Sequence, residues 1–312
     1  MSSSHASYFI FSPEDNDIEL VLPQFVNALI TENTAPEIIN QAIYRFRTLA
    51  AKGHAAIALE HNTQEFLGII FYEDHYNTAE LSYPYSLADD TKINKALIEI
   101  AAGDCLKNGT VGMRIEKQII PGREAVNAAN EAGFLNHSRY RMSLDLTEKM
   151  PEKTIPPAAI NFKTINIKYL PEIAKVIISA NENTKDAEIF YPLLFDTKYC
   201  TKWLERVFSG YYGKLLSASR LAFRGNELVG VCLIVELADG IAGVMEISVL
   251  KNVSGRGIGT ALTSASMAQL HDDGYDIVEL AVTKGNTAAK KIYEKLGFVE
   301  VNEYTVCYKD RT

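Results

Sequence analysis

"VSGRGIGTAL", residues 253–262, places glycines at positions 255, 257 and 259, directly before an apolar pattern of helical period. Glycine lacks a Cβ atom, so its backbone can adopt positive φ and can approach an anion closely. The first turn of the following helix presents free N–H groups, and the helix dipole adds about half a positive charge there. The stretch predicts a phosphate or pyrophosphate cradle. For an isolated G-x-G-x-G, a turn that merely caps a helix is the simpler alternative.

Two familiar glycine motifs do not fit this loop. The dinucleotide fingerprint G-x-G-x-x-G would need its last glycine at Thr260 or, counted from Gly257, at Leu262, and the Gly-Lys-Ser/Thr of a P-loop is missing. The context of the loop is more informative. It follows the strand-like "VMEISVL", residues 244–250, and is followed by "AVTKGNTAAKKIYEKLGF", residues 281–298. This order favours a ligand-binding loop over a turn.

With these segments in this order, the sequence resembles the GNAT superfamily of acyl-CoA-dependent N-acyltransferases, in its tandem form with two domains. The family's phosphate loop has the pattern (Gln/Arg)-x-x-Gly-x-(Gly/Ala). In this sequence Ser254, Gly257 and Gly259 occupy the three defined positions. Ser254 departs from the pattern, which removes one polar contact but leaves the backbone cradle intact. Residues 285–298, "GNTAAKKIYEKLGF", resemble the family's Asn, alanine-rich helix, Tyr and closing Leu-Gly-Phe.

The resemblance implies an α/β fold of two tandem GNAT-like domains, each a mixed central sheet flanked by helices. It implies transfer of an acetyl or other short acyl group from coenzyme A to an amine of a small molecule, with acetyl-CoA as co-substrate. The pantetheine arm would enter a gap between the strands at 244–250 and 276–282, and Tyr293 would protonate the leaving thiolate. The residues to which it assigns contact with the coenzyme are Val249, Ser254, Gly255, Arg256, Gly257, Ile258, Gly259, Thr260 and Asn286.

Glu246 is the candidate general base, because a carboxylate in the middle of a mostly buried strand is unusual. Strand alternation places it on the face shared with Val244 and Ser248. Its alternative is a charge at a sheet edge or pocket rim.

The other candidates also have structural alternatives. Asn286 precedes a helix and can serve as its N-cap, Tyr293 can be ordinary packing, and Arg256 can be a solvated loop cation. The competing function is a non-catalytic acyl-CoA-binding or regulatory module.

Composition excludes several other classes. The chain has 312 residues, 47% of them hydrophobic and 22% charged, which predicts about two globular domains. A net charge of −8 argues against nucleic-acid binding. The first residues do not resemble a signal peptide, and no apolar run is long enough for a membrane helix, so we expect a cytoplasmic protein. The four cysteines are expected to be buried thiols, and no metal-binding spacing of His occurs.

"TEKMPEKTIPPAAI", residues 147–160, is rich in proline and charge and predicts a linker. We therefore expect a degenerate GNAT-like domain at 1–146, a linker at 147–158, and a GNAT domain with the acyl-CoA site at 159–312. Two anchor pairs, residues 96–97 with 261–262 and 109 with 274, lie 165 positions apart, and a third, 133–134 with 297–298, lies 164 apart. Three anchors in the same order indicate an internal repeat.

The first copy of the repeat lacks the residues that would hold the coenzyme. Lys92 and Asn94 stand where the second copy has Gly257 and Gly259, and Ala129 stands opposite Tyr293. Gly122 similarly replaces Asn286. The sequence therefore predicts one acyl-CoA per chain, bound in the second half.

Overall fold

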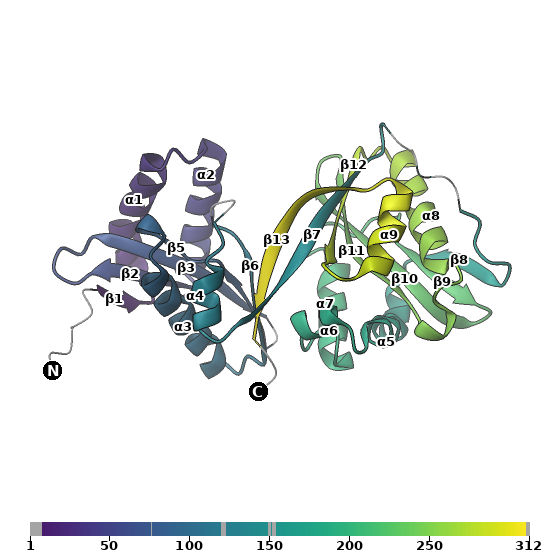
Figure 1. Ribbon diagram of the computed structural model, residues 1–312, viewed down its shortest axis with the longest axis horizontal. Coiled ribbons are helices and arrows are strands. Elements are labelled where there is room, and N and C mark those ends of the chain that lie inside the picture. Colours follow the sequence, from purple (N-terminus) through teal and green to yellow (C-terminus); the bar gives the residue numbers. More distant parts are fainter. Residues whose placement is uncertain (1–7, 76, 120–122, 149–150, 152–153, 310–312) are drawn as a thin grey trace. The chain divides into compact units, whose positions relative to one another are not determined.

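The structure is a computed structural model that describes residues 8–75, 77–119, 123–148, 151 and 154–309 (Figure 1). It divides into two compact units. The first comprises Met1–Asn136 together with Thr305–Thr312, and the second comprises His137–Tyr304. Among the described residues, no helix is long and apolar enough to cross a membrane. All four cysteines are buried free thiols, as predicted.

Unit 1 contains a mixed sheet covered by helices on both faces. Its strands run in the order β1 (Tyr8–Phe11), β2 (Ala55–Glu60), β3 (Phe66–His75), β4 (Thr78–Ser82), β6 (Gly112–Lys117) and the end of β13 (Val299–Tyr308), with β5 (Tyr85–Ser86) beside β3. The pairing of β4 with β6 is parallel. The helices are α1 (Asp15–Thr31), α2 (Pro36–Arg45), the π-helix η1 (Phe46–Ala50), the short 3-10 helix η2 (Leu87–Asp89), α3 (Thr91–Lys107) and α4 (Val126–Glu131).

Unit 2 repeats this plan. Its strands lie in the order β7 (Leu135–Asp145), β12 (Ile277–Thr283), β11 (Ile241–Val249), β10 (Glu227–Ala238), β9 (Arg220–Arg224) and β8 (Ile160–Thr164). The helices and short 3-10 turns are η3 (Ile167–Tyr169), α5 (Leu170–Asn181), α6 (Lys185–Ile189), α7 (Thr197–Phe208), η4 (Lys251–Val253), α8 (Ile258–Asp272) and α9 (Thr287–Leu296). One core cluster joins the sheet to α8 and α9, and another joins it to α5 and α7. The predicted α/β class, with two copies of a mixed sheet flanked by helices, is confirmed.

The strands that close each unit do not follow the boundaries of the sequence repeat. The last strand of the first copy, β7, pairs with β12 from Arg139 opposite Thr283 to Asp145 opposite Ile277. The end of β13 pairs instead with β6, where Cys307 lies opposite Ile115. The compact units therefore differ from the expected divisions at 146 and 159, because each contains a final strand from the other copy. Parts of the predicted linker lie outside the described residues.

Candidate functional site

The glycine loop connects β11 to α8 in unit 2 (Figure 1). Gly255 and Gly257 have φ of +73° and +81°, and Gly257 is the N-cap residue of α8. A Cβ atom at either position would meet nothing within 4 Å, so both glycines border open space. Gly259 has no positive φ, and a Cβ there would lie 3.7 Å from a methyl of Val249. The backbone thus has the conformation and clearance that an anion at a helix N-terminus requires.

The side chains of this loop contribute less than its backbone. The Ser254 hydroxyl donates to the carbonyl of Lys251 at 3.0 Å, which closes the turn before the glycines. Arg256 is exposed, Thr260 is half-buried, and the side chain of Ile258 is buried in the core. Contact between Ile258 and a phosphate could therefore come only through its N–H group. Val249 is half-buried at the end of β11.

The ladder between β11 and β12 is short. Its parallel pairs run from Ile241 opposite Ile277 to Gly243 opposite Glu279. Beyond Gly243 both strands continue, and all of their residues are described, but they form no further pairs with one another. The facing edges of β11 and β12 are thus unpaired beyond Gly243. Glu246 and the glycine loop lie beyond this point along the chain.

A β-bulge changes the direction of Glu246. Val244 pairs with Ile234 of β10, whereas Glu246 pairs with the adjacent Leu233, so Met245 is the extra residue. A bulge interrupts the alternation of a strand and re-aims its side chains. The expectation that Val244 and Glu246 share a face is therefore wrong. Val244 packs with the core on the α8 side, and Glu246 lies with Ser248 on the α5 side.

The Glu246 carboxylate is held by hydroxyl and amide groups. The Ser248 hydroxyl donates to its Oε1 atom at 2.7 Å, and the Asn181 amide approaches the Ser248 oxygen at 3.4 Å. Burial raises the pKa of Glu246 to about 7, against the opposing effect of the Ser248 hydrogen bond. Such a carboxyl group can exchange a proton near neutral pH.

Tyr293 lies on α9 with its ring half-buried, 5.9 Å from the centroid of the Phe298 ring. Burial raises the pKa of its hydroxyl, and the negative charge of Glu246 raises it further. The structure therefore brings the predicted acid and the predicted base within electrostatic range of one another. A phenol with a raised pKa stays protonated at neutral pH and can donate a proton.

Asn286 is the N-cap of α9, where its Oδ1 atom accepts a hydrogen bond from the Ala289 N–H at 3.3 Å. Its side chain is exposed. The structural alternative predicted for this residue is thus present, and contact with a coenzyme stays a prediction.

Sequence reasoning missed a second charged group in this unit. Asp186 on α6 accepts a hydrogen bond from the Thr283 hydroxyl at 2.5 Å, and Arg139 of β7 lies 4.0 Å from the same carboxylate oxygen. The Arg139 guanidinium also lies 4.7 Å from the centroid of the Phe190 ring. Asp186 raises the pKa of Glu246, whereas Arg139 lowers it. No local motif marks these residues, because they come from three separate elements.

In the first copy, a side chain of the protein itself binds the N-terminus of the equivalent helix, α3. The Asp90 carboxylate accepts hydrogen bonds from the N–H groups of Lys92 and Ile93 at 2.8 and 3.2 Å, at the start of α3. Asn94 is buried and donates to Asp89 at 3.0 Å. A carboxylate of the chain thus occupies the place where an anion would bind. Ala129 is buried, and Gly122 lies outside the described residues.

Comparison with known proteins agrees with this geometry. Residues 183–298 match the family model described as the acetyltransferase (GNAT) family. Unit 2 therefore contains a GNAT-family domain. Across the whole chain the fold resembles a GCN5-related N-acetyltransferase from Sphaerobacter thermophilus, with a TM-score of 0.64 and 16% identity over 99% of this chain and 97% of that one. It also resembles a tandem GNAT protein from the clavulanic acid biosynthesis pathway, with a TM-score of 0.56 and 14% identity over 98% and 99% of the two chains.

Curated relatives match over a shorter stretch. A mycothiol acetyltransferase of Thermobispora bispora is 44% identical over 84 residues, which are 25% of this chain and 28% of that protein. The mycothiol acetyltransferase of Streptomyces scabiei is 37% identical over 93 residues, or 30% of each chain. The matches thus span less than a third of the length of these relatives.

Proposed function

We propose that unit 2 transfers an acetyl group from acetyl-CoA to the amine of a small molecule. The observation that carries this proposal is the occurrence, in one GNAT-family domain, of an open positive-φ glycine loop at a helix N-terminus together with Glu246 and Tyr293. A small-molecule acceptor is supported by the partial relatives named mycothiol acetyltransferase. Action in the cytoplasm remains a prediction.

The residues of the loop fit the coenzyme. Gly255, Gly257 and the N–H groups at the start of α8 would hold its pyrophosphate, and Arg256 and Asn286 lie exposed beside that helix end and at the start of α9. The unpaired edges of β11 and β12 beyond Gly243 would accept its arm. When bound, acetyl-CoA supplies an activated thioester.

Acetyl transfer needs one proton removed from the amine and one given to the leaving thiolate, and a different side chain would perform each transfer. Glu246, with a pKa of about 7, would take a proton from the acceptor amine as the amine attacks. Ser248 and Asn181 hold its carboxylate in place. Tyr293 would give its proton to the departing thiolate. Because a nearby negative charge disfavours a phenolate, ionised Glu246 raises the pKa of Tyr293 and keeps its hydroxyl protonated.

The alternative is a domain that binds acyl-CoA and has lost turnover. The Ser254 replacement favours it, since that side chain bonds to Lys251 within its own turn. The two functions separate in one assay, which follows thiol release from acetyl-CoA with a panel of primary amines. An enzyme releases thiol in proportion to acceptor, and a binding module binds acetyl-CoA in calorimetry but releases none.

A further inference from the structure

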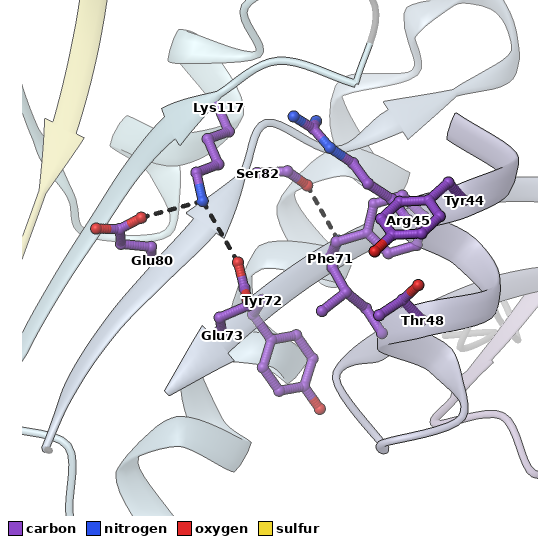
Figure 2. A pocket seen from close by; sticks show the side chains of 10 residues that line it. Tyr44, Arg45, Thr48, Phe71, Tyr72, Glu73, Glu80, Ser82 and Lys117 are labelled. Atoms are coloured by element: carbon purple, nitrogen blue, oxygen red, sulfur yellow. Dashed lines mark hydrogen bonds and ion pairs between the residues drawn. The ribbon is translucent and has the colours of Figure 1, made fainter. Parts of the chain in front are cut away.

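Unit 1 contains a pocket of about 260 Å³, formed by α2, η1, β3, β4 and β6 (Figure 2). Aromatic and aliphatic side chains form part of its wall, with Phe71 and Leu49 buried and Tyr44 exposed at 72%. The remaining wall is charged or polar. The proposed acetyl transfer assigns no role to this pocket.

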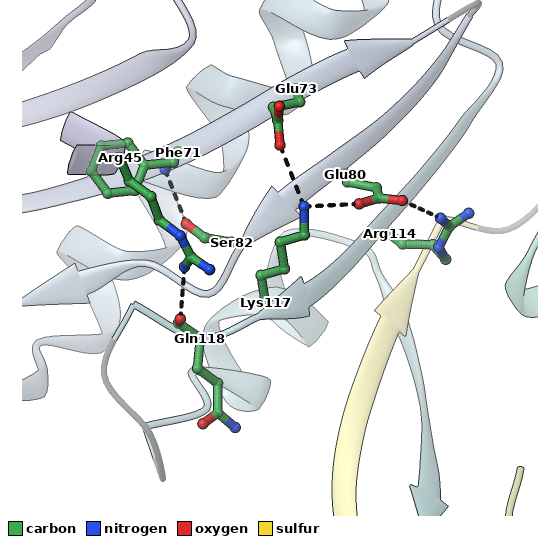
Figure 3. Close-up of polar contacts among 8 residues, drawn as sticks. All are labelled: Arg45, Phe71, Glu73, Glu80, Ser82, Arg114, Lys117 and Gln118. Carbon is green, nitrogen blue, oxygen red and sulfur yellow. Dashed lines mark hydrogen bonds and ion pairs between the residues drawn. The ribbon is translucent and has the colours of Figure 1, made fainter. Parts of the chain in front are cut away.

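Two carboxylates lie directly opposite each other in this wall. Glu73 of β3 pairs with Glu80 of β4 in the antiparallel ladder. Like charges at such positions are destabilising unless a cation lies between them. The Lys117 ammonium does so, 3.3 Å from each carboxylate, and Arg114 binds the other oxygen of Glu80 at 2.9 Å (Figure 3).

A β-bulge in β6 places Lys117 on this face. Ile115 pairs with Leu81, but Lys117, not Glu116, pairs with the next residue, Ser82. Glu116 is therefore the extra residue of the bulge. If the side chains of β6 alternated regularly, Glu116 would pair with Ser82, and its carboxylate would lie where the Lys117 ammonium now lies. The bulge thus converts an acidic face into one with a central cation.

The pocket offers more hydrogen-bond donors than its own residues use. Lys117 has three N–H groups, of which the two carboxylates take two. Arg45 has five, and among the described residues it donates a hydrogen bond to the carbonyl of Gln118, at 3.2 Å. The Ser82 oxygen accepts from the Phe71 N–H at 3.0 Å, which leaves its hydroxyl hydrogen for another acceptor.

The formal charges of the pocket lining balance, and Arg114 beside it adds a further cation. Burial by itself would lower the pKa of Lys117, but Glu80 and Glu73 outweigh this and raise it, so the ammonium stays charged. Lys117 and Arg45 carry two positive charges against the two of Glu73 and Glu80, and Arg114, outside the lining, binds Glu80 and offsets part of its charge. A monoanion therefore suits this pocket better than a phosphate dianion, which would bring two negative charges next to two carboxylates.

We propose that this pocket binds the carboxylate of a small organic acid, with Arg45 and Lys117 as donors and the apolar part of the acid against Phe71 and Tyr44. Planar guanidinium and carboxylate groups can form paired, charge-assisted hydrogen bonds. The pocket is small for a ligand site, which suits an acid of limited size. Glu73 and Glu80 act as positioning residues that hold the Lys117 ammonium.

The test uses the full chain and a set of probes: propanoate, benzoate and 3-phenylpropanoate, their uncharged amides, and inorganic phosphate. Binding is measured by ligand-observed NMR and calorimetry. We expect the aromatic acids to bind and their amides to bind at least about tenfold more weakly, as expected when charge-assisted bonds are lost. Arg45→Gln should weaken the acids about tenfold or more. Arg47→Gln changes an exposed arginine of the adjoining π-helix η1 that does not line the pocket, and it should leave binding unchanged.

The proposal is overturned by equal binding of an acid and its amide, by tighter binding of phosphate than of the acids, or by no binding of any acid. Equal losses in the two arginine variants would also overturn it. Circular dichroism and thermal unfolding verify that Arg45→Gln is folded, and if it is not, Lys117→Gln provides the same comparison. Acetyl-CoA turnover is not part of the readout, so failure here is distinct from failure of the proposed acetyl transfer.

Discussion

Glu246 shows how a single residue gains its chemistry from its surroundings. Its side chain lies on a central strand, where burial moves its pKa to about 7 and Ser248 limits its orientation. The folded state therefore favours the protonated carboxyl group more strongly than the unfolded chain does, since the ordinary pKa is 4.5. Between these two values the native state holds more protons, so the free energy of unfolding falls as the pH rises through this window.

We predict that kcat/KM for acetyl transfer rises with pH through an apparent pKa of about 7, as Glu246 loses its proton. Glu246→Gln should remove this limb and lower the rate by about 10²–10⁴-fold, because positioned proton transfer is typically worth that much. Steady-state kinetics across the pH range measure both effects. Glu227→Gln, at the surface end of β10, is the control. An unchanged limb in Glu246→Gln would assign the base to another group.

Tyr293→Phe keeps the ring beside Phe298 and removes only the hydroxyl. We expect little change in thermal stability or in acetyl-CoA affinity, and a fall in kcat approaching ~10²–10⁴-fold, since the proposed proton donor is lost. Tyr275→Phe removes another hydroxyl of the same unit, bonded to Glu236, and should leave kcat unaltered. Full turnover in Tyr293→Phe would show that the ring serves packing alone.

Among the elements, the start of α8 has the sharpest requirement on its sequence. Gly257 combines a φ of +81° with open space around its missing Cβ atom. Gly274, just beyond the end of α8, has a φ of +85° and equally open space. Replacement of either glycine by Val causes a similar backbone strain. Only the residue at 257 would intrude on a ligand at the helix N-terminus.

We therefore predict that Gly257→Val abolishes detectable acetyl-CoA binding in calorimetry, while Gly274→Val retains it. Loss of several charge-assisted contacts at roughly 1.5–3 kcal/mol each would weaken affinity by orders of magnitude. Thermal unfolding should show similar shifts for the two variants. If Gly257→Val binds the coenzyme normally, the loop is only a turn.

For the molecule as a whole, the two copies share a fold but differ at the start of the equivalent helices. The Asp90 carboxylate bonds to the first N–H groups of α3, so a second anion would meet both negative charge and occupied donors. We predict one acetyl-CoA per chain. Calorimetry should give a stoichiometry near one, and Gly257→Val should remove it. Two equivalent sites, or binding that survives Gly257→Val, would contradict this.

The exchange of final strands predicts that unit 1 depends on the end of the chain. Val306, Cys307 and Tyr308 are buried, and the Glu124 carboxylate accepts from the Thr305 N–H at 3.1 Å. Loss of each large buried side chain costs roughly 2–5 kcal/mol. A chain that stops after Tyr304 should therefore unfold at a markedly lower temperature in calorimetry, whereas one that stops after Lys309 should not. Equal unfolding temperatures would show that β13 does not support this sheet.

Much of this protein could be predicted from its sequence, because the determining signals are local. Helix periodicity and turn glycines fix the order of elements, so the α/β class and the duplicated plan agree with the structure. The glycine loop was equally readable, since positive φ at 255 and 257 depends on the residues themselves.

Only the tertiary structure decided features that depend on neighbours distant in sequence. The bulge at Met245 separates the faces of Val244 and Glu246, because strand register is set by pairing with β10 and not by alternation alone. Asp186, Arg139 and Thr283 meet only after three elements pack together. The pairing of β7 with β12 and of the end of β13 with β6 likewise depends on strands that are distant in sequence. Backbone hydrogen bonds in a ladder are the same for any sequence, so local sequence does not specify which copy of a repeat they join.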